Sequence, residues 1–261
     1  MAYFQYKGKN VFYDEYGESE NIVLLLHGNT ASSLMFSDMI KLFEKDFKIV
    51  VIDFLGCGKS EKVEKLDTDL WYDEAQQVIQ LLDLKKYKNV NIIGTSGGAI
   101  VAINVALERP DLVNKVIADS FEGERALDIV TNTIVEDREN SKKDDNTRMF
   151  YYLMNGEDWE KAIDSDTKAM YEHAKKIKKF YNKDLNELSV PILFTGSKED
   201  EFVSMISNNF YNELFKNLIS KVQNGSMYIF EQGGHPAMLS NADKFFELAK
   251  EFLNSDCQKR K

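Results

Sequence analysis

Short apolar runs alternate along this chain with longer stretches in which apolar residues recur at helical spacing. Two segments near the N-terminus alternate aromatic and polar residues and predict a hairpin. Six later runs of five or six residues are almost continuously apolar, which is typical of strands covered on both faces in a parallel sheet. The eight predicted strands are residues 3–7, 11–16, 22–26, 48–53, 90–94, 115–119, 191–195 and 227–231.

The region 121–187 carries only helical periodicity, with several aromatic residues and no strand pattern. We therefore predict a core made of residues 1–120 and 188–261, with residues 121–187 inserted as a helical cap over one edge of the sheet. The length of 261 residues, with 43% apolar and 29% charged side chains, suits one large globular α/β domain with such an insertion.

The pentapeptide Gly94-Thr95-Ser96-Gly97-Gly98 directly follows the predicted strand 90–94 and precedes a small-residue helical stretch, 99–107. A G-x-S-x-G turn between a strand and a helix lifts the serine hydroxyl out of the backbone, and its glycines avoid collisions within the strained turn. Ser96 is therefore a candidate nucleophile.

A serine hydroxyl needs a base to take its proton and a third group to orient that base. Of three histidines, His27 ends a strand and His173 lies in a charged helical segment, where we expect it to be solvated. His235 lies in a loop after the last predicted strand and is the candidate base. The loop after strand 191–195 is acidic and supplies a carboxylate.

With these features the chain resembles the α/β-hydrolase family, whose triad runs in the order nucleophile, acid, histidine. The resemblance implies an eight-stranded, mostly parallel sheet with helices on both faces. It also implies the triad Ser96, Asp200 and His235. The family's usual spacing from the loop glycine would select Glu199, whereas the apolar residues that follow favour Asp200, so Asp200 is expected and Glu199 is the alternative.

Two further loops carry the resemblance. His27-Gly28-Asn29 is similar to the family's H-G-x loop, and residues 53–60 are similar to its D-x-x-G-x-G-x-S loop. The resemblance implies that the backbone N–H groups of Asn29 and Gly97 form an oxyanion hole. His27 is expected to tie down the first loop rather than move protons.

These residues together predict a cofactor-free serine hydrolase that cleaves a small to medium ester or activated acyl compound through an acyl-enzyme. Carbon–carbon bonds, thioesters and N-terminal prolyl peptides remain alternatives within the family. A ligand receptor of the same fold with negligible turnover is the alternative from another class. Repeated turnover of an ester would distinguish the enzyme from the receptor.

Charge and motifs exclude other functions. The net charge of −10 disfavours nucleic acid as a partner. No spacing of His, Cys or carboxylates matches a metal site. Gly58-Lys59-Ser60 resembles the end of a nucleotide-phosphate loop, but Asp53 stands where that loop needs its first glycine. A dinucleotide-binding motif starting at Gly56 would need its last glycine where Glu61 stands. Cys57 and Cys257 provide no disulfide framework, and no leader or membrane-spanning pattern is visible. We expect a cytoplasmic protein with a small-molecule acyl substrate, and the sequence leaves its oligomeric state open.

Overall fold

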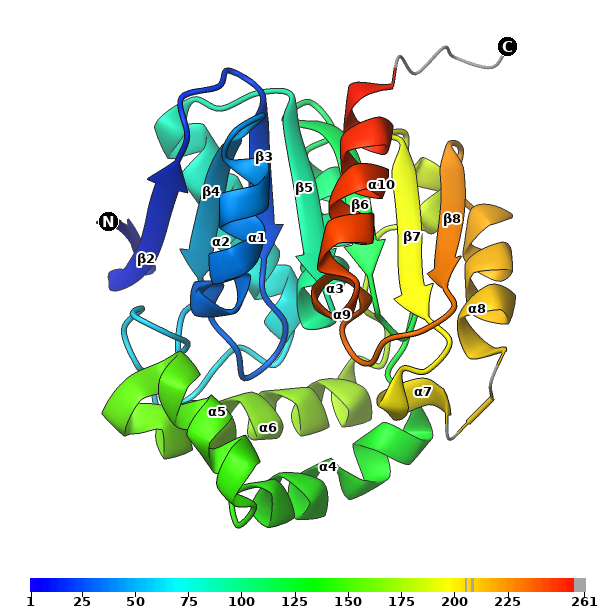
Figure 1. The fold of residues 1–261 in the computed structure, drawn as a ribbon. Helices are drawn as coiled ribbons and strands as arrows, with labels where there is room; N and C mark the ends of the chain where they lie inside the picture. Colours follow the sequence, from blue (N-terminus) through cyan, green and yellow to red (C-terminus); the bar gives the residue numbers. More distant parts are fainter. Residues whose placement is uncertain (205, 208, 256–261) are drawn as a thin grey trace.

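A computed structural model describes residues 1–204, 206–207 and 209–255. Its centre is one eight-stranded sheet with the order β1-β2-β4-β3-β5-β6-β7-β8 (Figure 1). The strands are β1 (Ala2–Tyr6), β2 (Lys9–Tyr16), β3 (Ile22–Leu26), β4 (Lys48–Asp53), β5 (Val90–Thr95), β6 (Val113–Asp119), β7 (Ile192–Ser197) and β8 (Gly225–Phe230).

The hairpin β1–β2 is antiparallel and joins β4 antiparallel, whereas every pair from β4 to β8 is parallel. The predicted mostly parallel sheet is confirmed. The last strand begins two residues before its apolar run, because Gly225 already pairs with Ile192 of β7. As an edge strand, β8 alternates in exposure instead of being buried throughout.

Helices cover both faces of the sheet and form two buried apolar clusters. The helices are α1 (Ser37–Phe43), α2 (Leu70–Lys85), α3 (Gly97–Glu108), α4 (Asp128–Ser141), α5 (Asp145–Asn155), α6 (Trp159–Lys176), α7 (Glu201–Ser204), α8 (Phe210–Ile219), α9 (Ala237–Ser240) and α10 (Ala242–Asn254). One cluster joins the sheet to α2, α3 and α8, and the other joins it to α1 and α10. In the described ranges, none of the helices is both long and apolar enough to cross a bilayer.

The segment between β6 and β7 contains α4, α5 and α6, which we call the α4–α6 segment. These helices lie across the carboxyl ends of the parallel strands, at the lower edge of the sheet in Figure 1. The segment leaves and rejoins the core at one place, because Arg125 and Lys179 form an antiparallel bridge and the Phe180 N–H donates to the Glu124 carbonyl at 3.0 Å.

Candidate active site

Ser96 occupies the sharp turn between β5 and α3. Its φ of +55° and ψ of −125° lie outside the regions that residues with side chains favour. Both flanking glycines are required by close packing, because a Cβ on Gly94 would lie 2.0 Å from the Gly98 carbonyl oxygen and one on Gly98 would lie 2.2 Å from that of Leu26. The turn therefore raises a half-buried hydroxyl at the carboxyl edge of the sheet.

The predicted acid and base are in direct contact. Asp200 Oδ2 lies 2.8 Å from His235 Nδ1, and the Asp200 side chain is completely buried. The same carboxylate accepts hydrogen bonds from the Tyr211 hydroxyl at 2.7 Å, also at Oδ2, and from the Phe202 N–H at 3.0 Å. These partners compensate the carboxylate for its loss of water, and they fix its orientation toward the imidazole.

The alternative acid, Glu199, has a different role. Its Oε2 accepts a hydrogen bond from the Gly233 N–H at 3.1 Å, and Glu201 Oε2 accepts one from the His235 N–H at 2.9 Å. Both glutamates bind the backbone of the loop that carries His235. The carboxylate that meets the imidazole is that of Asp200, so the geometry favours Asp200 over Glu199 as the orienting acid.

The end of β6 links the Ser96 turn to the His235 loop. The Ser96 N–H donates to the Asp119 carbonyl at 2.8 Å, while the Asp119 carboxylate and the Ser120 hydroxyl accept from the N–H groups of Met238 and Ala237 at 3.1 and 2.8 Å. The chain from β8 accordingly runs back along the carboxyl ends of the strands to α9 (Figure 1). The structure thus brings Ser96 to the same edge as the Asp200–His235 pair.

Asp119 is itself a buried carboxylate that the sequence reasoning did not single out. Its oxygens accept hydrogen bonds from Thr195 Oγ1 at 2.7 Å and Thr95 Oγ1 at 2.9 Å, in addition to the Met238 N–H. Burial raises the pKa of Asp119 to about 6, although these hydrogen bonds and the nearby His235 act in the opposite direction. The available signal was its position, a charged residue at the end of a buried strand.

The loop after β3 lies directly against Ser96. A Cβ on Gly28 would be 2.9 Å from Ser96 Cβ, and a Cβ on Gly97 would be 2.2 Å from Asn29 Oδ1. Asn29 and Gly97, the two predicted oxyanion donors, are therefore close neighbours beside Ser96. Whether their backbone N–H groups act as oxyanion donors stays a prediction.

His27 and Asp53 hold the backbone around this loop. His27 Nδ1 lies 2.8 Å from the Gly28 carbonyl oxygen, and its Nε2 accepts from the Phe54 N–H at 3.1 Å. Burial lowers the pKa of His27. Because Nε2 accepts from a backbone N–H, the ring proton is assigned to Nδ1. Asp53 accepts from the N–H groups of Ser33 and Lys59, both at 2.7 Å. The D-x-x-G loop thus anchors the H-G-x loop.

The expectation that His173 is solvated is wrong. The side chain is completely buried, with its ring 4.8 Å from that of Trp71 and 5.7 Å from that of Phe180. Lys175 and Lys176, which follow it in α6, are exposed, whereas His173 packs against Trp71 of α2. A single histidine among charged residues does not reveal this orientation in the sequence.

Several residues outside the motifs also contact the site. Tyr211 binds the predicted acid, and three residues of the α4–α6 segment bind Asn29 or Thr30 in the loop after β3. No motif marks them, because they come from helices whose docking is not encoded in local spacing. The three are Arg138, Asn155 and Asp166.

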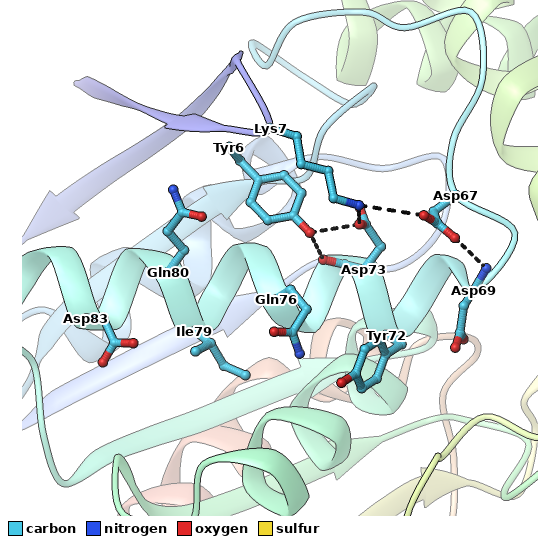
Figure 2. Close-up of a pocket in the computed structure, with 10 residues that line it drawn as sticks. All are labelled: Tyr6, Lys7, Asp67, Asp69, Tyr72, Asp73, Gln76, Ile79, Gln80 and Asp83. Carbon is cyan, nitrogen blue, oxygen red and sulfur yellow. Dashed lines mark hydrogen bonds and ion pairs between the residues drawn. The ribbon is translucent and has the colours of Figure 1, made fainter.

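A cleft of about 590 Å³ lies elsewhere, along α2 and the end of β1 (Figure 2). Lys7 and Tyr6 both point toward Asp73, at 2.6 and 2.7 Å. None of Ser96, Asp200 and His235 lines this cleft. In the part of the chain that the structure describes, no group of three or more His, Cys, Asp or Glu side chains is arranged to hold a metal ion.

Comparison with known proteins identifies the family of this chain. The model of the alpha/beta hydrolase fold family matches residues 21–152, just over half of the chain. The serine hydrolase BPHL of Homo sapiens is 25% identical over 256 residues, covering 94% of this chain and 84% of the relative. The 2-hydroxy-6-oxononadienedioate/2-hydroxy-6-oxononatrienedioate hydrolase of Paraburkholderia xenovorans is 25% identical over 269 residues, covering 92% and 89%.

Among solved structures, MGS-M2, an alpha/beta hydrolase enzyme from a Medee basin deep-sea metagenome library, superposes with a TM-score of 0.75. The match covers 100% of both chains at 18% identity. The chain belongs to the α/β-hydrolase family. It is a hydrolase, with relatives that include proteins named as serine hydrolases.

Proposed function

We propose that this protein is a serine hydrolase that cleaves a small to medium ester, or a similarly activated acyl compound, through an acyl-enzyme. The observation that carries the proposal is the buried Asp200 carboxylate held 2.8 Å from His235 Nδ1, at the sheet edge where Ser96 occupies its strained turn. A hydroxyl, an imidazole and an orienting carboxylate are the components that acyl transfer by a serine requires.

The mechanism follows from these positions. Ser96 Oγ attacks the carbonyl carbon while His235 Nε2 takes its proton, and Asp200 orients the imidazole and stabilises its positive charge. The N–H groups of Asn29 and Gly97 donate to the oxyanion of the tetrahedral intermediate. The protonated His235 then gives its proton to the leaving alcohol, and a water molecule activated by His235 releases the acid.

The α4–α6 segment acts in this proposal as the cap that bounds the acyl pocket. Its position across the carboxyl ends of the strands supports this role (Figure 1). A second candidate within the family is hydrolysis of a carbon–carbon bond. It is favoured by the 25% identity, over 92% of this chain, to a relative named as a 2-hydroxy-6-oxononadienedioate hydrolase.

The test is steady-state turnover of chromogenic esters of increasing acyl length, alongside thioester, prolyl amide and vinylogous diketone substrates. Ser96→Ala serves as the blank. We expect turnover of at least one ester, reduced by about 10⁴ to 10⁶ in Ser96→Ala. Asp200→Asn should lose about 10⁴ in kcat, whereas Glu199→Gln should change it little. Ester turnover that survives in Ser96→Ala would refute the mechanism, and repeated cleavage of the diketone alone would favour the second candidate.

A further inference from the structure

Each helix of the α4–α6 segment places one polar side chain on the loop that carries the proposed oxyanion donor Asn29. Asn29 Nδ2 donates to Asp166 Oδ1 of α6 at 2.6 Å. Arg138 Nη1 of α4 donates to Thr30 Oγ1 at 3.1 Å, and Asn155 Nδ2 of α5 donates to the Thr30 carbonyl at 2.9 Å. Three contacts from three helices thus converge on two consecutive loop residues.

Thr30 is the strained residue of this loop. Its φ of +64° is left-handed, which a residue with a branched side chain rarely adopts unless its surroundings impose it. Its hydroxyl donates to the Asn29 carbonyl at 2.6 Å while accepting from Arg138, and its own carbonyl is bound by Asn155. The α4–α6 segment therefore holds Thr30, the residue that follows Asn29, in an unfavourable backbone conformation.

The Asn29 carboxamide lies between the segment and the catalytic turn. Its Oδ1 accepts from Trp71 Nε1 at 3.2 Å, and the same oxygen occupies the space beside Gly97 that a Cβ would fill. Asp166, which fixes the other end of the carboxamide, is buried, with Arg138 Nη2 3.9 Å from its Oδ2. Within the described residues, that Oδ2 has no hydrogen-bond partner, so the Asp166 carboxylate makes its hydrogen bond through Oδ1, with Asn29.

We infer that Asp166 is a positioning residue for the oxyanion hole: through Asn29, with Arg138 and Asn155 holding Thr30, docking of the α4–α6 segment sets the two backbone donors beside Ser96. The inference rests on the proposed acyl-transfer function. If the helices lift to admit a substrate, Asn29 and Thr30 lose these three hydrogen bonds, and the hole regains its shape only when the helices dock again. Chemistry is thereby restricted to the docked state.

Asp166→Ala tests this inference, with Asp166→Asn as the conservative variant and Asp164→Ala as the matched control. Asp164 lies on the same helix, is exposed and pairs with Lys142. The first readout is the second-order rate at which a fluorophosphonate labels Ser96. We expect a loss of about 10² in Asp166→Ala, the scale of removing one oxyanion donor. Recovery to within about tenfold is expected in Asp166→Asn, which keeps the acceptor Oδ1, and the control should match the wild type.

With an ester that the enzyme turns over, the loss in Asp166→Ala should fall on kcat and leave KM nearly unchanged, because the donors act mainly in the transition state. A purely structural role predicts equal losses in the Ala and Asn variants, in parallel with a lower Tm. That result, or wild-type labelling in Asp166→Ala, overturns the inference.

The second readout is amide hydrogen exchange of the peptide covering residues 27–36, which needs no substrate. Faster exchange there in Asp166→Ala, with protection of β5 and α3 unchanged, is the expected result. Unchanged exchange in residues 27–36 overturns the inference. A wild type that neither labels nor turns over any ester would refute the proposed function, whereas the exchange experiment still decides whether the segment holds the loop.

Discussion

Tyr211→Phe removes one hydroxyl group from the support of the proposed catalytic acid and leaves the aromatic packing in place. The Tyr211 ring is buried and stacks on Phe215 with centroids 5.1 Å apart, a contact that phenylalanine preserves. Its hydroxyl donates at 2.7 Å to Asp200 Oδ2, the oxygen that also faces His235. Burial and the neighbouring Asp200 raise the pKa of Tyr211 well above its usual range, so the hydroxyl remains a donor at every pH at which the protein is assayed.

The magnitude follows from the charge on the acceptor. A hydrogen bond to a charged group contributes about 1.5–3 kcal/mol, so the variant should lose about 2 kcal/mol of unfolding free energy. At about 2–4 °C per kcal/mol for a domain of this size, Tm should fall by about 4–8 °C. With one of three donors gone, Asp200 is less firmly oriented, and a loss of about 1.4 kcal/mol in the transition state would lower kcat about tenfold.

Thermal unfolding and ester turnover check both effects, and Tyr228→Phe is the matched control because its side chain is 45% exposed at the edge of the sheet. We expect the control to behave as the wild type. If Tyr211→Phe changed Tm by less than about 1 °C and left kcat intact, the hydroxyl would contribute nothing to the acid, and the argument from its geometry would be wrong.

Two further predictions concern buried contacts of the site. Asp119 has a folded-state pKa of about 6 against an ordinary value of 3.8. The folded protein therefore binds this proton more tightly, and the stability that Asp119 contributes is lost as pH rises from about 4 through about 6. Asp119→Asn cannot titrate, so its unfolding free energy should rise relative to that of the wild type by up to roughly 3 kcal/mol as the pH is raised from 4 to 7. Urea unfolding measures this difference, and a difference that does not depend on pH would contradict the prediction. In Gly97→Ala, the new Cβ would lie 2.2 Å from Asn29 Oδ1 and 2.8 Å from Trp71 Nε1. Displacement of the Asn29 carboxamide should lower kcat/KM about 10²-fold with native circular dichroism, and a fully active variant would exclude close packing of these two segments.

Local patterns in the sequence predict the sheet and the Ser96 turn well, for physical reasons. Strands covered on both faces must be apolar throughout, so each of them can be recognised in the sequence as a separate apolar run. The turn needs glycines at 94 and 98, because backbone carbonyls occupy the space of a side chain there. His235 is identified by its place after the last strand, which chain order alone provides.

Contacts between distant elements are invisible in the same patterns. Spacing could not decide between Glu199 and Asp200, because the choice depends on how the 232–235 loop returns along the sheet edge. Tyr211 and Asp166 come from amphipathic helices, in which a polar residue turned inward has the same local sequence as one turned to solvent. The burial of His173 could not be predicted from the sequence for the same reason.

The bridge between Arg125 and Lys179 has an evolutionary consequence. Since the excursion that contains α4, α5 and α6 starts and finishes at adjoining points, helices of other lengths could be exchanged there without altering strand register. Such an exchange would discard the side chains that reach Asn29 and Thr30. On the proposed function, a protein that acquired a new substrate range by such an exchange would have a poorly positioned loop after β3, and compensating polar groups would have to evolve at the same helix positions.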